Sequence, residues 1–340
     1  MPDSDHTQPG SAAAGDPSLV YFSLEQAVLQ ADWPAVEAML RHGRIRVNDT
    51  GRVLLAKWLP ESAPLSVLVC YLEQGYAPNI AFFDNVTLLA RAARNNRADM
   101  VQPLIDYGAE LDFRDVVTHR TAVDWALDAG HEALAMAMLD RARMLCRASF
   151  GSMLRSAFSE AVRAGRLVFL EGLVARNVHG LIPLDQREQK LAEALRRGAN
   201  GLSLCLIDLC ESMNHYRDRV GDSLLGAACE GANVPVIEKL IARGGDIHHR
   251  NNLGESLFKK LAWWSGHGGI PDESANHVKI MRRAIHDCLL KHGADPSDPD
   301  PFLRLWNEAA TRTDLSDADK ADWVDRELKK LRDSIPGQRS

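Results

Sequence analysis

The sequence predicts an all-α fold of about eight stacked helix-turn-helix units, followed by a C-terminal capping helix. Three observations predict it. Glycine recurs at a period of about 33 residues, at Gly43, Gly75, Gly108 and, about four periods later, Gly244. About sixteen residues before these glycines stand small or apolar residues, Ala27, Leu59, Ala92 and Ala228. Between the two markers, apolar residues follow helical spacing. Such a period indicates copies of one small unit that bury their apolar faces against each other.

The unit around Gly108 shows the pattern most clearly. Its first segment places Leu88, Leu89, Ala92 and Ala93 on one helical face, and its second does the same with Met100, Val101, Leu104 and Ile105. Each segment is too short to form a stable helix alone, so the two are expected to pair and to pack on a neighbouring unit. Gly108 follows the second segment, where a left-handed residue ends a helix. Pro103 is expected to weaken or kink that helix.

Several segments resemble the ankyrin repeat, whose pattern contains a Thr-Pro-Leu-His box, a Gly-His turn and a Gly-Ala-Asp close. They are Thr121-Ala-Val-Asp-Trp-Ala126 with Gly130-His131, Gly221-Asp-Ser-Leu-Leu-Gly-Ala-Ala228 with Gly244-Gly-Asp246, and Leu289-Leu-Lys-His-Gly-Ala-Asp295. The resemblance covers roughly residues 20–298 and implies an ankyrin-repeat solenoid that binds proteins. It also implies that His131 braces the backbone of a neighbouring unit.

The period divides the chain into expected segments. Residues 1–19 form a disordered leader, 20–298 the repeat array, 299–335 a C-terminal helical cap and 336–340 a frayed tail. The expected units are 20–50, 51–81, 82–115, 116–149, 150–181, 182–217, 218–250 and 251–298. The last is longer than the others, which indicates an insertion near 265–277, rich in glycine and polar residues. In the cap, Ser316 with Asp319 predicts a helix beginning at Asp317.

Composition excludes several classes of function. Hydrophobic residues make up 46% and charged residues 25% of 340 residues, as in ordinary folded proteins. A net charge of −6 does not favour binding to nucleic acid or to an anionic membrane. No apolar run approaches the length that spans a bilayer, and the N-terminus lacks the apolar core of a secretory signal. The six cysteines contain no CxxC pair and indicate reduced core thiols in a cytoplasmic protein.

Candidate sites for chemistry are few. His248, His249, His267 and Cys288 match no metal-ligand spacing, so the histidines are interpreted as solvent-facing turn residues. The aspartates around the last helix, Asp314, Asp317, Asp319, Asp322 and Asp325, lack the glycine and glutamate of an EF-hand. Gly266-His-Gly-Gly269 lacks the lysine of a phosphate-binding loop. We therefore predict no catalytic residue, no cofactor and no bound metal.

Binding residues are predicted from the phase of the repeats. In ankyrin stacks the concave face is formed by the first helices and the turn tips, which implies the partner-binding residues Arg94, Asn95, Asp128, Arg163, Arg196, Arg197, Glu230, Arg114, His119, Arg120, His248 and Arg250. Arginine is frequent among them and recognises carboxylates. We therefore predict a partner with an acidic surface or segment. The adjacent indoles of Trp263 and Trp264, beside the insertion, add a candidate anchor.

The function that follows is a non-catalytic scaffold for protein–protein interaction, monomeric when free and cytoplasmic. Two alternatives stay open within it: a bacterial effector exported into a host cell, and an immunity or inhibitor protein for a toxin or enzyme. A further alternative is an enzyme or enzyme regulator that uses residues 263–276. The resemblance and the composition favour the scaffold.

Overall fold

The structure is a computed structural model that describes residues 24–42, 57–79, 86–231, 233–263, 272–295 and 301–333. Within these ranges the regular secondary structure is helical, with no β-strand. The leader and the frayed tail expected at residues 1–19 and 336–340 lie outside them. The chain forms two compact units, residues 1–160 and 161–340, and each is described separately.

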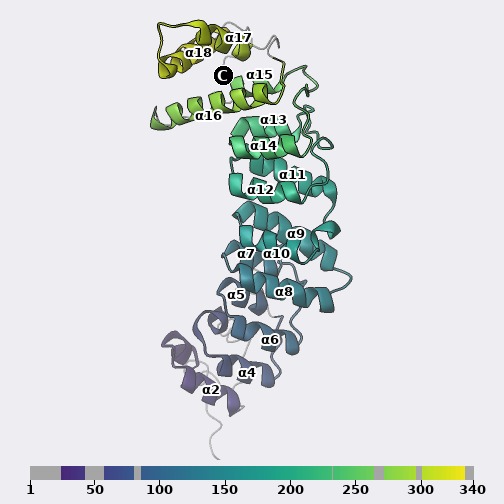
Figure 1. Ribbon diagram of the computed structural model, residues 1–340. Helices are drawn as coiled ribbons and strands as arrows, with labels where there is room; N and C mark the ends of the chain where they lie inside the picture. Colours follow the sequence, from purple (N-terminus) through teal and green to yellow (C-terminus); the bar gives the residue numbers. More distant parts are fainter. Residues whose placement is uncertain are drawn as a thin grey trace, which may run out of the picture. The chain divides into compact units, whose positions relative to one another are not determined.

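Unit 1 is a stack of short helices (Figure 1). Its helices after the helical segment 24–29 are α2 (Trp33–Arg41), α4 (Leu65–Glu73), α5 (Leu88–Arg94), α6 (Ala98–Asp106), α7 (Ala122–Asp128), α8 (Glu132–Leu145) and most of α9 (Phe150–Ala164). Helices α5 and α7 pack side by side as first helices of adjacent repeats. Helices α2, α4 and α6 form the row of second helices. Each repeat therefore contributes one helix to each layer.

Unit 2 continues the same two-layer arrangement within itself (Figure 1). The helices are α10 (Leu167–Ala175), α11 (Leu184–Arg196), α12 (Asn200–Asp208), α13 (Leu224–Gly231), α14 (Val234–Ala242), α15 (Leu257–Trp263), α16 (Asp272–Lys291), α17 (Pro301–Thr311) and α18 (Asp317–Asp333). One layer is the row α11, α13, α15 and α17, and the other is α10, α12, α14, α16 and α18. These stacked helix pairs confirm the predicted all-α repeat fold.

Local sequence signals set the ends of these helices. The Thr87 and Thr121 side chains cap α5 and α7, and Asp124 completes a capping box with Thr121. Gly108 has φ +92°, a left-handed conformation that costs glycine little, and it ends the pair α5–α6 as predicted. His131 Nε2 lies 3.0 Å from the carbonyl oxygen of Arg94 in the preceding repeat. The bracing role implied for His131 is confirmed.

The C-terminal segment is a further helix pair. Helix α18 begins at Asp317, and the backbone N–H of Asp319 donates to the Ser316 hydroxyl at 3.2 Å, which confirms the predicted cap. Helix α17 contacts α15 and α18 contacts α16, so this pair extends both layers of unit 2. Residues 272–277, expected within the insertion, belong to α16, whereas 264–271 lie outside the described ranges.

The core of each unit is made of aliphatic side chains and a few aromatic ones. Phe158 and Leu89 in unit 1, and Leu195 and Ala228 in unit 2, are fully buried. Four cysteines, Cys70, Cys210, Cys229 and Cys288, are buried free thiols, and Cys146 and Cys205 are partly exposed. Burial raises the pKa of the Cys210 thiol to about 12, so it packs as a neutral thiol. None of the described helices combines the length and apolar character needed to cross a bilayer.

Candidate protein-binding surface

The turn tips before three first helices share one hydrogen-bonded construction. In each, a carboxylate or amide side chain accepts from backbone N–H groups two to five residues later. Asp115 accepts from Val117 and Arg120, Asp218 from Val220 and Asp222, and Asn251 from Leu253 and Glu255, at 2.9–3.1 Å. Such Asx turns replace the hydrogen bonds that water would otherwise make. The tips are therefore fixed in shape.

Each braced tip presents an apolar side chain to solvent. Val117 is 71% exposed and its neighbour Val116 67% in unit 1, and Leu253 is 69% and Val220 40% exposed in unit 2. In unit 2 the two tips are joined, because the backbone N–H of Asn252 donates to the carbonyl of Val220 at 2.9 Å. Apolar side chains held rigidly in water lose little conformational entropy when a partner covers them. We call these three turn tips, with their exposed side chains Val116, Val117, Val220 and Leu253, the apolar tips.

Hydrogen bonding also determines the ionisation of Asp115. Burial of its carboxyl acts to raise the pKa, but the hydrogen bonds donated by Thr118, Arg120 and Val117 outweigh it and lower the pKa below its ordinary value. The Asp115 side chain is therefore charged at neutral pH. Since the lowered pKa belongs to the folded state, the stabilisation from this carboxylate is present above about pH 4. It is lost as the pH falls through the folded-state pKa.

Asp115→Ala should lower the free energy of unfolding by about 1–2 kcal/mol at neutral pH, because the backbone donors of the tip lose a charged acceptor and fall back on water. Denaturant unfolding at several pH values is the measurement. The deficit should shrink below about pH 4. Asn251→Ala is the matched control, since it removes an uncharged acceptor from a turn of the same kind in another repeat. A deficit of Asp115→Ala that stays constant down to pH 2 would contradict the electrostatic account.

The arginines among the predicted partner-binding residues are called the arginine set: Arg94, Arg114, Arg120, Arg163, Arg196, Arg197 and Arg250. Arg196 of this set forms ion pairs within its own unit. Its guanidinium lies 2.6 Å from the Asp218 carboxylate and 3.2 Å from that of Glu230. These two ion pairs join α11 to the next tip and to α13. Arg197 is more exposed, and it donates to the carbonyl of Val162 at 3.3 Å and lies 3.5 Å from Glu193. Arg196 therefore stabilises the stack and leaves little charge for a partner.

Unit 1 shows the same engagement around Trp125 of α7. The guanidinium groups of Arg94 and Arg120 each lie 5.2 Å from the centre of the Trp125 ring, within cation–π range. Arg120 also lies 3.2 Å from Asp128 and 3.5 Å from Glu160. Arginine side chains thus cover the indole of a first helix. Trp125 is partly buried beneath them, as expected for a structural residue.

The remaining predicted residues are placed as follows. Arg114 donates to the carbonyl of His119 at 2.8 Å and to the Ser152 hydroxyl at 3.0 Å. Asn95, His119, Arg163, His248 and Arg250 are exposed. His249, also interpreted as solvent-facing, instead brings Nε2 within 2.7 Å of the Gly221 carbonyl in the neighbouring tip. The side chains of Trp263 and Trp264 lie outside what the structure describes. Their role as a partner anchor stays a prediction.

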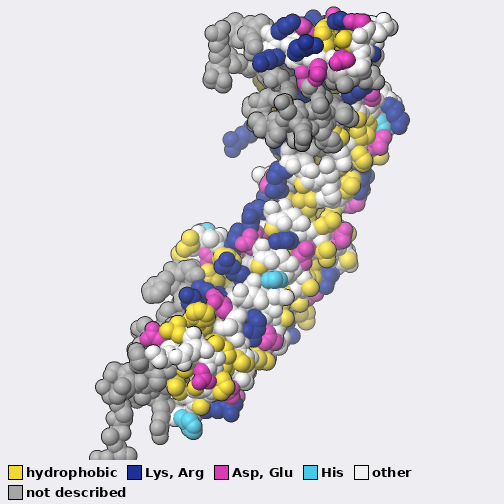
Figure 2. Space-filling view, turned by 90° about the vertical axis from the view of Figure 1, so that its left-hand side faces the viewer, with side chains coloured by type: hydrophobic (Ala, Val, Ile, Leu, Met, Phe, Trp, Pro, Cys, Tyr) yellow, Lys and Arg dark blue, Asp and Glu magenta, His cyan; other side chains and the backbone are white. Residues whose placement is uncertain are grey.

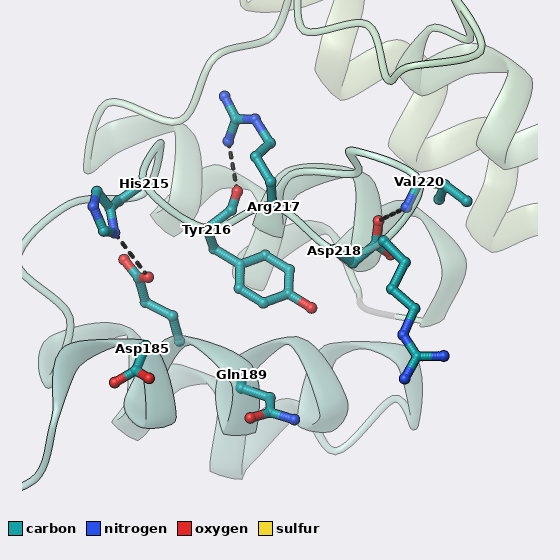
Figure 3. A pocket seen from close by; sticks show the side chains of 9 residues that line it. Asp185, Gln189, His215, Tyr216, Arg217, Asp218 and Val220 are labelled. Carbon is teal, nitrogen blue, oxygen red and sulfur yellow. Dashed lines mark hydrogen bonds and ion pairs between the residues drawn. The ribbon is translucent and has the colours of Figure 1, made fainter.

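A polar pocket of about 750 Å³ opens between α11 and the segment 215–220 (Figure 3). Asp185, Glu188 and Gln189 of α11 line one side, and His215 and Tyr216 the other. The Glu188 side chain is almost fully buried, and one of its oxygens lies 3.3 Å from His215 Nδ1. The pocket continues to Val220, so polar groups and an apolar tip share one surface of unit 2.

Charges on the described surface are mixed in sign. On the face shown in Figure 2, Lys and Arg side chains are interspersed with Asp and Glu side chains. Among the described residues, Arg196 and Arg120 each lie beside carboxylates. Such a surface favours no single charge on a partner. The acidic character of the partner stays a prediction, and the apolar tips become the more distinctive feature.

The apolar tips were not predicted from the sequence. The signal that finds them is the phase of the repeats: an Asp or Asn stands five or six residues before the helix-starting Thr121, Ser223 or Ser256, with valine or leucine two residues after it. The pattern was hidden because only three of the expected units carry it. Repeat phase could not have predicted the pocket, because no recurring sequence spacing links the buried Glu188 to the exposed His215.

Comparison with known proteins gives limited similarity. No family model matches the chain. Protein PhlB of Serratia liquefaciens is 29% identical over 111 residues, which are 33% of this chain and 49% of that protein. The chain thus spans about half the length of this curated relative.

Similar solved structures include the human ASB11 ankyrin repeat domain, with 24% identity and a TM-score of 0.47, over 68% of this chain and 95% of that domain. Another is the Bd0816 predatory endopeptidase of Bdellovibrio bacteriovorus in complex with immunity protein Bd3460, with 15% identity and a TM-score of 0.31, over 62% of this chain and 91% of that one. An ankyrin repeat domain is therefore among the similar structures, as the sequence resemblance predicts. TM-scores below 0.5 carry no functional argument, so function is argued from the chain's own surface.

Proposed function

We propose that this protein is a non-catalytic scaffold that binds a partner protein through its apolar tips and acts by occlusion or recruitment. The observation that carries the proposal is the exposure of Val117 and Leu253 on tips that are braced by buried or half-buried side-chain acceptors. Apolar anchors surrounded by polar groups are typical of the centre of a protein interface. Rigid tips lower the entropy lost on binding.

The polar contacts around the tips support recognition rather than chemistry. Backbone N–H groups of the tips donate to the side-chain oxygens of Asp115, Asp218 and Asn251. The guanidinium groups of Arg196 and Arg120 form ion pairs with neighbouring carboxylates. These groups hold the tips and first helices in place, and none of them is left as a general base or nucleophile. A surface whose shape is fixed in this way is suited to binding another protein.

Affinity capture tests the proposal. The tagged chain is incubated with lysate of its own cell and, separately, with eukaryotic lysate, and bound proteins are identified by mass spectrometry. A stoichiometric partner from its own cell would support the immunity or inhibitor alternative, whereas a partner found only in the eukaryotic lysate would support the exported effector. Stoichiometric capture in neither would contradict the scaffold proposal.

The double variant Val117→Asp/Leu253→Asp should reduce capture of the same partner at least about tenfold, because in each unit a charged group then replaces an apolar anchor. Both side chains are exposed, so the thermal unfolding should stay close to that of the unaltered chain. Val168→Asp, which alters an equally exposed valine on α10, is the matched control. Equal capture by the double variant and the control would contradict binding through the tips.

The arginine set provides a separate test of the partner's charge. If the partner is acidic, replacing Arg163 and Arg197 by glutamate should weaken capture at low salt, and the loss should fade as salt increases. Arg196 is left intact in this variant because its ion pairs stabilise unit 2. Unchanged capture at low salt would contradict an acidic partner while leaving the role of the apolar tips open to its own test.

A further inference from the structure

Helices α14 and α16 bring together three side chains that can bind a metal ion. Glu238 lies on α14, Cys288 lies in the last turn of α16, and His292 directly follows that helix. A carboxylate oxygen, the Cys288 sulfur and a ring nitrogen of His292 all lie within 4.8 Å of one another. The sequence pattern grouped Cys288 only with His248, His249 and His267, and this arrangement was not predicted.

The fold explains why these residues meet. Cys288 and His292 are four residues apart, and the His292 backbone N–H still donates to the Cys288 carbonyl at 3.1 Å, so both side chains share one helical face. Packing of α16 on α14 places Glu238 opposite that face. Gly293, with φ +96°, ends the helical turn immediately afterwards. The register of two packed helices therefore fixes all three donors.

The donor set matches the preferences of zinc. Thiolate, imidazole and carboxylate are the three side-chain ligands that Zn²⁺ takes in proteins, and softer and harder metals favour other sets. Zinc–ligand bonds of about 2.0–2.3 Å place neighbouring ligand atoms about 3.5 Å apart in a tetrahedral site. Because the ligand atoms lie at most 4.8 Å apart, they need to approach by no more than about 1.3 Å to reach this geometry. Glu238 and His292 are exposed, so their side-chain torsions can supply this movement.

The surroundings also favour a cation at this point. The last carbonyl groups of α16 carry the negative end of the helix dipole, and cations are stabilised there. In the structure a cation already lies near this helix end, because the Lys291 ammonium is 3.8 Å from the Glu238 carboxylate. Its side chain is 73% exposed and can move into water when a metal ion takes its place. Cys288 itself is only 5% exposed, so the fold holds this residue in place.

We propose that Glu238, Cys288 and His292 form a binding site for a zinc-class divalent metal ion that fastens α16 to α14. The three side chains supply three ligands, and the fourth tetrahedral position faces solvent, where water completes the coordination. The Cys288 thiol releases its proton when the metal–sulfur bond forms, and neither the metal nor the protein changes oxidation state. The ion cross-links two adjacent repeats and adds its binding free energy to the stability of unit 2.

The experiment uses the full-length chain, stripped of metal and kept reduced. Co²⁺ is added as a spectroscopic probe, and Zn²⁺ is then titrated calorimetrically. We expect one tightly bound equivalent, a thiolate-to-cobalt charge-transfer band and tetrahedral d–d absorption that Zn²⁺ abolishes. We also expect Zn²⁺ to raise the Tm of the chain.

Two variants locate the site. Cys288→Ser should abolish the charge-transfer band, and His292→Ala should weaken Zn²⁺ binding at least about tenfold. His292 is exposed, so that variant should fold normally even if the loss of the buried thiol harms the fold. Cys146→Ser and His248→Ala are matched controls, since each removes a potential ligand that lies elsewhere.

Retention of the band and of the affinity in His292→Ala would overturn the proposal, as would equal losses in the two control variants. Binding of Co²⁺ without a thiolate band would also overturn it, because Cys288 would then take no part. Loss of the Tm increase in His292→Ala, with normal folding of the metal-free variant, would support the fastening role. Loss of partner capture tests a different surface, so the two proposals can fail independently.

Discussion

Lys260→Met is expected to lower the free energy of unfolding of unit 2 by about 2–3 kcal/mol at neutral pH, because it removes one partner from a partly buried ion-pair cluster. The Lys260 ammonium on α15 lies 2.6 Å from the Asp222 carboxylate, which is only 5% exposed. It also lies 3.7 Å from Glu230 and 3.6 Å from Glu255. The Lys260 ammonium thus connects carboxylates of two adjacent repeats. Methionine would remove the cation beside the buried Asp222 carboxylate, whereas Glu230 keeps Arg196 and Glu255 keeps Lys259.

The effect of this substitution should depend on pH. Burial acts to lower the pKa of Lys260, but Asp222, Glu230 and Glu255 outweigh it and raise the pKa, so its contribution is complete at neutral pH and lost only at alkaline pH. For Glu255, burial acts to raise the pKa, whereas hydrogen bonds from Asn251 and Lys259 and the nearby ammonium lower it. The contribution of Glu255 is therefore lost as the pH falls below about 4. The deficit of Lys260→Met should narrow in the same range, because the ion pair of Lys260 with Glu255 is then lost from the unaltered chain as well.

Denaturant unfolding of the unaltered chain and of Lys260→Met between pH 3 and pH 8 is the measurement. Lys259→Met is the matched control, because the neighbouring Lys259 is more exposed than Lys260 and forms an i,i+4 pair with Glu255 at 3.0 Å. That pair should contribute no more than about 0.5 kcal/mol. Equal effects of the two substitutions at neutral pH would contradict the cluster as the connection between these repeats.

Gly231→Ala is expected to destabilise unit 2 by about 1–3 kcal/mol, the usual cost of overpacking. Gly231 is the last residue of α13, and a Cβ atom there would lie 2.5 Å from the carbonyl oxygen of Arg196 and 2.7 Å from that of Leu195. Backbone atoms of α11 cannot yield as a flexible side chain does. The two first helices must therefore separate, and the interface that couples these repeats is weakened.

Gly201→Ala is the control for this prediction. Gly201 lies in α12, has an ordinary helical conformation, and a Cβ atom there would meet no atom within 4 Å. Alanine at such a position should raise the free energy of unfolding by about 0.5–1 kcal/mol, since it restricts the unfolded chain. Opposite signs of the two effects in chemical denaturation would support the close approach of α11 and α13. A stabilising effect of Gly231→Ala would contradict it.

Repeat phase made much of the fold predictable. The glycine period located Gly75, Gly108 and Gly244, which all have positive φ values. The Gly-His turn predicted the contact of His131 with the preceding repeat, and Ser316 predicted the start of α18. The glycine positions and the start of α18 depend on residues close together in the chain, whereas the His131 contact with Arg94 was implied by the ankyrin resemblance. The boundaries of the expected units and the partner-binding residues stay predictions.

The arginine set shows where phase alone falls short. Phase placed Arg196 and Arg197 on one face, but it could not show that Asp218 and Glu230 balance the first of them. Those acids come from a later tip and a later helix, separated from Arg196 by 22 and 34 residues. Whether a charged side chain is offered to a partner or used within the fold depends on such distant neighbours.

By itself, the sequence determined that the chain is an all-α array of repeated helix pairs, because each helix start, turn and stop depends on residues close together in the chain. Only the tertiary structure decided which side chains meet across repeats: Lys260 with Asp222, Glu238 with Cys288 and His292, and the bare backbone of α11 with Gly231. The reason is physical. These contacts depend on the register of packed helices, and a shift of one residue rotates a side chain by about 100° around its helix.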